Sequence, residues 1–112
     1  MNSCDKGKRG EREAAREIAR VLGVEARRGQ QFAGGPDSPD VVHGLDGVHF
    51  EVKRTEKLHL WPAIEQAVAD AMGSVPVVLH RPNNHPWVAI LRLDDLPRLA
   101  ELIAERGSDA QA

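Results

Sequence analysis

Three polar residues alternate with apolar ones in the segment 48–54 and can carry chemistry together. His49, Glu51 and Lys53 share one face of an extended chain, because successive side chains of a β-strand point to opposite faces. A carboxylate and an amine side by side on one strand can act on the same substrate. We therefore expect Glu51 and Lys53 to belong to an active site. His49 can reach the same site, but we expect it to be an ordinary hydrogen-bonded histidine.

Asp40 adds a second carboxylate. It opens a short predicted strand, which a turn at residues 44–47 joins in a hairpin to the strand of Glu51. Two neighbouring carboxylates repel each other unless a cation lies between them, and oxygen ligands favour Mg²⁺, with Mn²⁺ as a substitute. Such an ion polarises a phosphoryl oxygen and lowers the pKa of its bound water, which is the chemistry of phosphodiester cleavage. Lys53 can orient this water or offset charge that develops at phosphorus.

A predicted first helix supplies a third carboxylate. Its apolar residues recur with helical spacing over 10–22, and Glu11 continues their stripe toward the start of the helix. Glu13 instead shares a face with other charged residues, which we interpret as the solvated side. We therefore choose Glu11 as the third acid and expect it to bind metal with Asp40 and Glu51.

The hydrophobic periodicity predicts an α/β protein with the element order α-β-β-β-α-β-β-α. The expected helices span about 10–22, 62–73 and 94–107. The expected strands span 24–28, 40–42, 48–54, 75–80 and 87–92, the last two on either side of the turn-rich segment 81–86. A length of 112 residues favours one domain, 1–112, with flexible tails at 1–8 and 107–112.

Composition excludes several classes of protein. The chain is 41% hydrophobic, and no apolar run approaches the roughly 20 residues of a membrane span. A single cysteine and the lack of an apolar secretion signal indicate a cytoplasmic protein. The histidines show no zinc-binding spacing. The formal net charge of −2 does not by itself indicate a nucleic-acid binder, although basic residues are concentrated in the first quarter of the chain.

Two motifs resemble known nucleases. Pro39-Asp40 followed by Glu51-Val52-Lys53 resembles the Pro-Asp…(Asp/Glu)-x-Lys signature of the PD-(D/E)XK superfamily. Residues 6–13, Lys-Gly-Lys-Arg-Gly-Glu-Arg-Glu, resemble the N-terminal motif of archaeal-type Holliday junction resolvases. Thr55-Glu56-Lys57 continues the lysine motif as in that family, and Pro76 lies at the start of the next strand. The chain thus resembles a phage or bacterial relative of these resolvases.

The resemblance implies a restriction-endonuclease-like fold, in which helices flank a mixed central sheet and the acids gather at one end of that sheet. It implies a metal-dependent endodeoxyribonuclease with Glu11, Asp40, Glu51 and Lys53 as catalytic residues. It further implies a homodimer that cuts branched DNA during recombination, such as the four-way Holliday junction. The two-fold symmetry of the dimer would match the symmetry of that junction.

Other basic and polar residues are candidates for DNA binding. Lys6, Lys8 and Arg9 precede the predicted first helix, whose free N-terminal amides favour anions. Arg27 and Arg28 flank the segment that leads to the predicted metal site, and Thr55 belongs to the family motif. For the charged members of this set, a role as solvated surface residues remains open.

Three alternatives remain. The net acidic charge and the central loop differ from the archaeal pattern, so the chain could cleave other DNA, such as flaps or linear duplex. A non-catalytic DNA-binding or assembly domain could keep the same fold. Finally, Asp40 and Glu51 could be surface charges on an unrelated α/β domain.

Overall fold

A computed structural model gives the structure of the chain; it describes residues 3–29 and 40–111, with side chains for 7–29 and 40–106. The elements in chain order are α1 (Ser3–Leu22), β1 (Ala26–Arg28), β2 (Val41–His43), β3 (Val48–Lys53), α2 (Leu60–Ala71), β4 (Val75–His80), β5 (Val88–Ile90), the 3₁₀ helix η1 (Leu93–Asp95) and α3 (Leu96–Gln111). The α/β class is confirmed, whereas the 3₁₀ helix before α3 was not expected. Pro39 of the nuclease signature lies outside the described residues.

Helix α1 begins at Ser3, well before the predicted start at Gly10. The prediction treated the glycine as a helix boundary, but a glycine inside a helix costs only about 1 kcal/mol relative to alanine. Lys6, Lys8 and Arg9 therefore lie within α1 and not before it, which corrects the prediction. Because Lys8 and Arg9 lie beyond the first turn, its free amides do not favour anion binding beside them.

The strands form two separate sheets. β3, β4 and β5 form a mixed sheet in that order, with β3 parallel to β4 and β5 antiparallel to β4. β1 and β2 form an antiparallel pair of their own. β4 and β5, on either side of the turn-rich segment 81–86, pair with each other, whereas the predicted pairing of β2 with β3 is wrong. β5 pairs with residues 78–80 of β4, so Pro76 lies on a part of β4 that β5 does not reach.

Two side chains explain why β2 does not pair with β3. His43 Nδ1 accepts a hydrogen bond from the Leu45 amide, so Nε2 carries the proton and donates it to the Val48 carbonyl oxygen at 2.9 Å. Asp40 Oδ2 accepts a hydrogen bond of 2.9 Å from the Val52 amide. These side chains take the backbone groups on the edge of β3 that faces away from β4. Burial lowers the pKa of His43, which favours the neutral ring that this arrangement needs.

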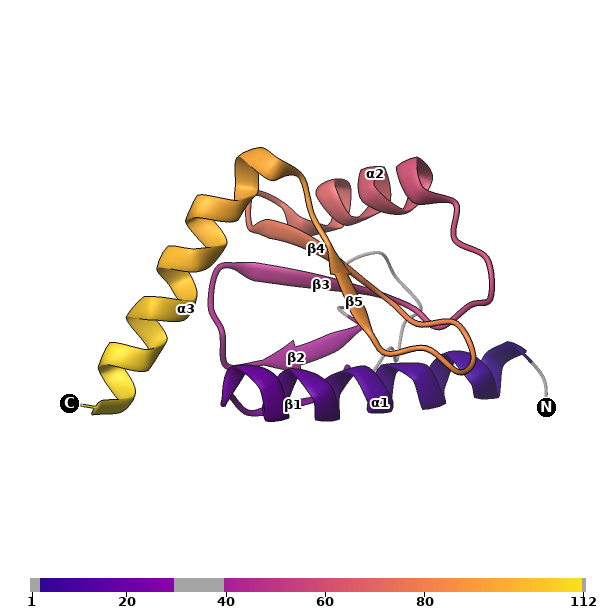
Figure 1. Cartoon of the computed structure of the whole chain (residues 1–112), viewed down its shortest axis with the longest axis horizontal. Helices are drawn as coiled ribbons and strands as arrows, with labels where there is room; N and C mark the ends of the chain where they lie inside the picture. Colours follow the sequence, from indigo (N-terminus) through magenta and orange to yellow (C-terminus); the bar gives the residue numbers. More distant parts are fainter. Residues whose placement is uncertain (1–2, 30–39, 112) are drawn as a thin grey trace.

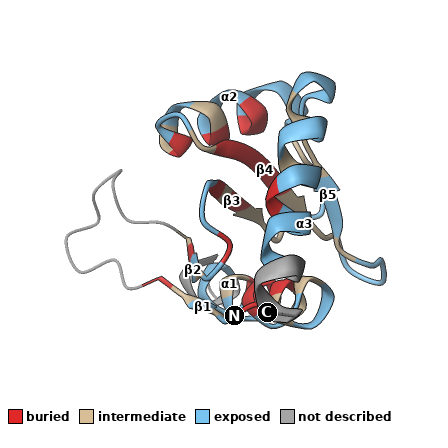
Figure 2. Ribbon diagram, turned by 90° about the vertical axis from the view of Figure 1, so that its left-hand side faces the viewer, coloured by how far each residue is buried: buried red, intermediate tan, exposed pale blue. Residues whose placement is uncertain are grey.

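The elements form layers around the three-stranded sheet. Figure 1 shows α1, with β1 and β2, along one side of this sheet and α2 along the other. Buried residues concentrate on β3, β4 and the inner side of α2 (Figure 2). Phe50 packs with Ile18 of α1 in the larger core cluster, whereas Ala67 of α2 packs with Val78 of β4 in a smaller one. The alternation along β3 therefore leaves Glu51 and Lys53 on the side of α2.

Helix α3 continues to Gln111 and does not stop at Gly107 as predicted. The reason is the same as in α1, since one glycine does not end a helix by itself. The helix projects at an angle from the sheet (Figure 1), and the buried Leu102 anchors it in the main core. Residues 3–8 and 107–111 thus fall inside helices. Within the described parts of the chain, no helix is long and apolar enough to span a membrane.

Candidate active site

A close approach of α1 to the end of β3 positions the first acid. Gly10 is buried, and a Cβ atom added to it would lie 2.5 Å from the Cβ atom of Arg54, the residue that follows β3. Any larger residue at this position of α1 would collide with Arg54. The glycine therefore lets the helix pack closely there, and Glu11 is held beside the end of the strand that carries Lys53.

Glu11 forms an ion pair with Arg28. Its Oε2 atom lies 2.8 Å from Arg28 Nε, and the two side chains are only 17% and 25% exposed. A backbone hydrogen bond links this pair to Asp40: the amide of Gly29, the residue after Arg28, donates to the Asp40 carbonyl oxygen. Arg28, proposed from the sequence to bind DNA, thus contacts an acid in this state.

The charges of Glu51 and Glu11 both affect the pKa of Asp40. Burial, together with the negative charges of Glu51 and Glu11, raises the pKa of Asp40 from 3.8 to about 6, against the opposing effects of the hydrogen bond from the Val52 amide and of the His49 ring. Glu11 and Glu51, which belong to two other segments of the chain, are thus both near enough for their charges to act on Asp40.

Lys53 lies beside this group. Its Nζ atom is 4.0 Å from Glu51 Oε1 and donates a hydrogen bond of 3.0 Å to Gln66 Oε1 on α2. Glu51 is the only charged residue with a buried side chain among the described residues, at 5% exposure. A buried carboxylate needs a compensating charge, and the amine of Lys53 supplies part of it.

Two further polar groups surround Glu51 and were not selected from the sequence. His49 Nε2 lies 3.2 Å from Glu51 Oε2, and this hydrogen bond, more than the charges of Glu51, Asp40 and Asp70, raises the pKa of His49 against the effect of burial. Asp70 of α2 offers a carboxylate oxygen close to both residues. Asp70 and Gln66 lie one turn apart beside the apolar stripe of their helix. The reasoning that selected Glu11 in α1 would have found them in α2.

Glu13 corrects another expectation. It does not lie on a solvated face: its side chain is 23% exposed, its Oε1 atom accepts a hydrogen bond from Arg81, and Arg54 Nε lies 3.8 Å from that oxygen. Arg54 in turn donates a hydrogen bond to the Arg81 carbonyl oxygen at 3.0 Å. Glu13 therefore ties α1 to the loop between β4 and β5, a contact between distant segments that helical periodicity cannot reveal.

The other DNA-binding candidates lie in different surroundings. Lys8, Arg9 and Arg27 are exposed, and the side chain of Lys6 is outside the described set. The hydroxyl of Thr55 donates a hydrogen bond to the Lys57 carbonyl oxygen at 2.7 Å, within the loop after β3.

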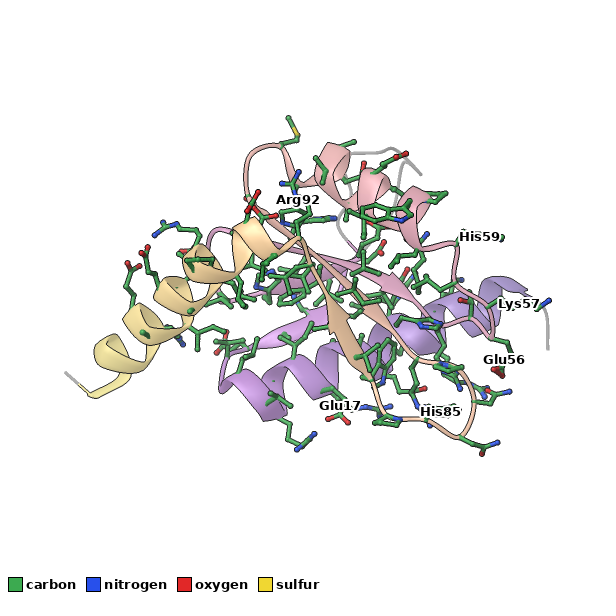
Figure 3. All side chains as sticks on the ribbon, turned by 45° about the horizontal axis from the view of Figure 1, so that its top comes forward. Glu17, Glu56, Lys57, His59, His85 and Arg92 are labelled. Carbon is green, nitrogen blue, oxygen red and sulfur yellow. The ribbon has the colours of Figure 1, made fainter. Side chains whose placement is uncertain are left out.

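A pocket of about 240 Å³ opens beside Lys53, between this loop and α2. Its lining includes Lys57, His59 and Gln66. Figure 3 shows Glu56, Lys57 and His59 at the same end of the molecule as His85, and Glu56 accepts a hydrogen bond from the Asn83 amide. The pocket thus adds basic and hydrogen-bonding groups next to the candidate catalytic lysine.

The donor set fits a divalent metal ion. Carboxylate oxygens from Asp40, Glu51 and Glu11 are ligands that Mg²⁺ and Mn²⁺ accept. Burial and, to a smaller extent, the charges of Glu51 and Glu11 raise the pKa of Asp40, so a cation bound beside it would favour its charged form. The Val52 amide holds Asp40 through Oδ2, which leaves Oδ1 for a ligand.

One of three comparisons with known proteins finds a similar fold. Neither models of protein families nor curated proteins give a match to the chain. In three dimensions the chain is similar to a Holliday junction resolvase. The matching structure is that of Hjc from Archaeoglobus fulgidus, an archaeal hyperthermophile, with a TM-score of 0.56 and 26% sequence identity over 74% of this chain and 73% of Hjc. The resemblance seen in the sequence motifs is thereby confirmed, and it supports a nuclease of the Hjc type.

Proposed function

We propose that this protein is a metal-dependent endonuclease of the PD-(D/E)XK type that hydrolyses phosphodiester bonds in branched DNA, with the Holliday junction as its substrate. The observation that carries the proposal is the pKa of Asp40, raised by its burial and by the charges of Glu51 and Glu11. A buried carboxylate that lies close to two other acids is costly for a small domain unless it serves a ligand. Similarity to Hjc supports the choice of DNA as the substrate.

In this proposal each residue has a distinct role. Asp40 and Glu51 hold Mg²⁺, or Mn²⁺ in its place, and Glu11 completes the acidic side of the site. The ion supplies a polarised phosphoryl oxygen and an activated water. Lys53, held by Gln66 at 3.0 Å, presents its ammonium group toward the phosphate and offsets the charge that develops there.

The DNA would approach over the surface near Lys53. Lys8, Arg9 and Arg27 are exposed cations that can contact phosphates, as can Lys6. Arg28 would exchange its contact with Glu11 for a phosphate when metal neutralises the acid. Thr55 would act through the shape of its loop, since its hydroxyl is bonded within that loop. Cleavage of DNA is consistent with the cytoplasmic location that the sequence predicts.

We also propose that the active form is a homodimer. An apolar groove of about 290 Å³ between α1, β5 and α3 supports this proposal. Exposed apolar side chains line it, with Val21 at 64%, Val88 at 46% and Ile103 at 37% exposure. A second copy of the chain would cover these side chains and would supply the two-fold symmetry that a four-way junction has.

The experiment is cleavage of a synthetic four-way junction, with and without Mg²⁺, by the wild type and by Asp40→Asn. The matched control is Asp46→Asn, which removes a similar charge from an exposed turn. We expect cleavage by the wild type and the control in Mg²⁺ only, and none by Asp40→Asn. Equal cleavage by all three proteins would contradict the assignment. A parallel series with flap and linear duplex separates other nucleases, and binding without cleavage indicates a non-catalytic domain.

A further inference from the structure

Helix α2 faces β3 with a spacing that matches the strand. Gln66 and Asp70 are four residues apart, about 6 Å along a helix, whereas Glu51 and Lys53 are two residues apart, about 6.6 Å along a strand. Gln66 therefore meets Lys53, with 3.0 Å between Oε1 and Nζ, while Asp70 meets Glu51 and its neighbour His49.

The groups at the Asp70 end come close enough to share an ion. One ligand atom each from His49, Glu51 and Asp70 lies within 4.8 Å of the other two. Ligands of one ion lie up to roughly 4.4 Å apart when the metal–ligand distance is near 2.2 Å, so small side-chain rotations suffice. The side chains of His49 and Glu51 are 13% and 6% exposed, which limits competition from water.

We propose that His49, Glu51 and Asp70 form a second cation site, which takes a transition-metal ion such as Mn²⁺ in preference to Mg²⁺. Imidazole nitrogen is a ligand of first-row transition metals, and Mn²⁺, the first of them in the affinity order, also accepts carboxylate oxygen, whereas Mg²⁺ prefers oxygen ligands and dehydrates reluctantly. The site lies on the α2 side of Glu51, and Glu51 is shared with the site of Asp40 and Glu11. The inference rests on the proposed function for its place in catalysis, where a second ion would further offset the charge of Glu51.

The same three side chains can also form an ion pair without metal, with His49 protonated between the two carboxylates. Metal binding and the ion pair exclude each other, because the Nε2 atom that faces Glu51 holds either the proton or the metal ion. If the ion pair forms instead, the protein does not bind a metal ion at these three residues.

The test is Mn²⁺ binding to the metal-free full chain in the absence of DNA, followed by electron paramagnetic resonance of the free ion. The variants are Asp70→Asn and His49→Gln, and the control is Glu65→Gln on the exposed side of α2. We expect the wild type and the control to bind one Mn²⁺ more than either variant, or to bind that ion at least tenfold more tightly. Circular dichroism checks that the variants fold.

A second measurement uses the wild type alone. Substoichiometric Zn²⁺, a diamagnetic ion, should shift the ¹⁵Nε2 resonance of His49 as expected for a nitrogen bound to metal, while the exposed His85 is unchanged and Mg²⁺ causes no comparable shift. Unaltered His49 resonances together with equal Mn²⁺ binding by all four proteins would overturn the proposal in favour of the ion pair. Junction cleavage in Mg²⁺ is scored separately: a wild type that binds the extra Mn²⁺ but cuts no DNA would refute the nuclease and leave the site standing.

Discussion

The carboxylate of Asp40 takes the place of a neighbouring strand, because its Oδ2 atom accepts the hydrogen bond that the Val52 amide offers at the free edge of β3. The residue thus has a structural contact and a chemical role at once. Asparagine can accept the same hydrogen bond without the charge. The Asp40→Asn substitution therefore separates the two roles.

The first prediction concerns the stability of the metal-free protein. The folded-state pKa of Asp40 is raised to about 6 from 3.8, so between these values the folded chain binds more protons than the unfolded one. The free energy of unfolding of the wild type therefore falls as pH rises through this window. Asp40→Asn lacks this fall and should be more stable at pH 7, by up to about 3 kcal/mol.

Urea denaturation at several pH values in a metal chelator measures this difference. Excess Mg²⁺ should stabilise the wild type and leave Asp40→Asn almost unaffected, because a ligand stabilises the state that binds it. Parallel stability curves for the two proteins between pH 4 and pH 7 would show that the pKa of Asp40 is not raised in the folded protein.

The second prediction concerns Lys53 and the residue that holds it. Lys53→Met should lower kcat for junction cleavage by about 10²- to 10³-fold, which is the usual loss when an enzyme lacks one group that stabilises charge in the transition state. Gln66→Met should lower kcat less, by roughly tenfold, since the amine remains but loses its acceptor. The KM for DNA should change little.

Gln66→Glu restores an oxygen acceptor and should recover most of the activity lost in Gln66→Met. A purely structural role would instead change the free energy of unfolding, which we expect to stay nearly constant because Gln66 is exposed. If both Gln66 variants lose the same activity, the residue does not position Lys53.

A pair of glycines in α1 provides the third prediction. Gly10→Ala places a Cβ atom 2.5 Å from that of Arg54, and this overlap should destabilise the fold by about 1–3 kcal/mol. Gly7→Ala meets nothing within 4 Å and should stabilise the helix by up to about 1 kcal/mol. Thermal denaturation compares the two, and shifts of the same sign would argue against the close packing of α1 on β3.

The fourth prediction concerns the homodimer. Val88→Glu combined with Ile103→Glu introduces charge into the apolar groove and should convert a dimer into a monomer in light scattering after size-exclusion chromatography. Met72→Glu, which changes an apolar residue that is 82% exposed at the end of α2, is the control and should remain dimeric. A dimer that survives the double substitution uses another face of the molecule.

Sequence reasoning recovered the elements because their periodicities are local. The alternation over residues 48–53 and the stripe behind Glu11 depend only on neighbours along the chain, and both correspond to observed elements. The errors concern interactions between distant segments. Which strand pairs with β2 depends on the side chains of His43 and Asp40, and these could be placed only once the turn between them and β3 was known.

In the candidate site, too, residues with local spacing signals were predicted and contacts between distant segments were not. Asp40, Glu51 and Lys53 stand out through their spacing along the chain, which explains why the sequence identifies them. Asp70 becomes a neighbour of Glu51 only through the packing of α2 on β3, and Glu13 becomes a neighbour of Arg81 only through the loop after β4. The position of Asp70 beside the apolar stripe of α2 is visible in the sequence, but the partners of Asp70 and Glu13 across the fold are not.

Pro76 limits how the sheet can grow. Because proline has no amide hydrogen, the edge of β4 beyond the reach of β5 offers no complete ladder to an incoming strand. The chain leaves the sheet after β5 and turns into η1 and α3. An edge closed in this way protects a small protein with an exposed apolar face from fibre-like association, so contacts between copies would have to form through side chains rather than through added strands.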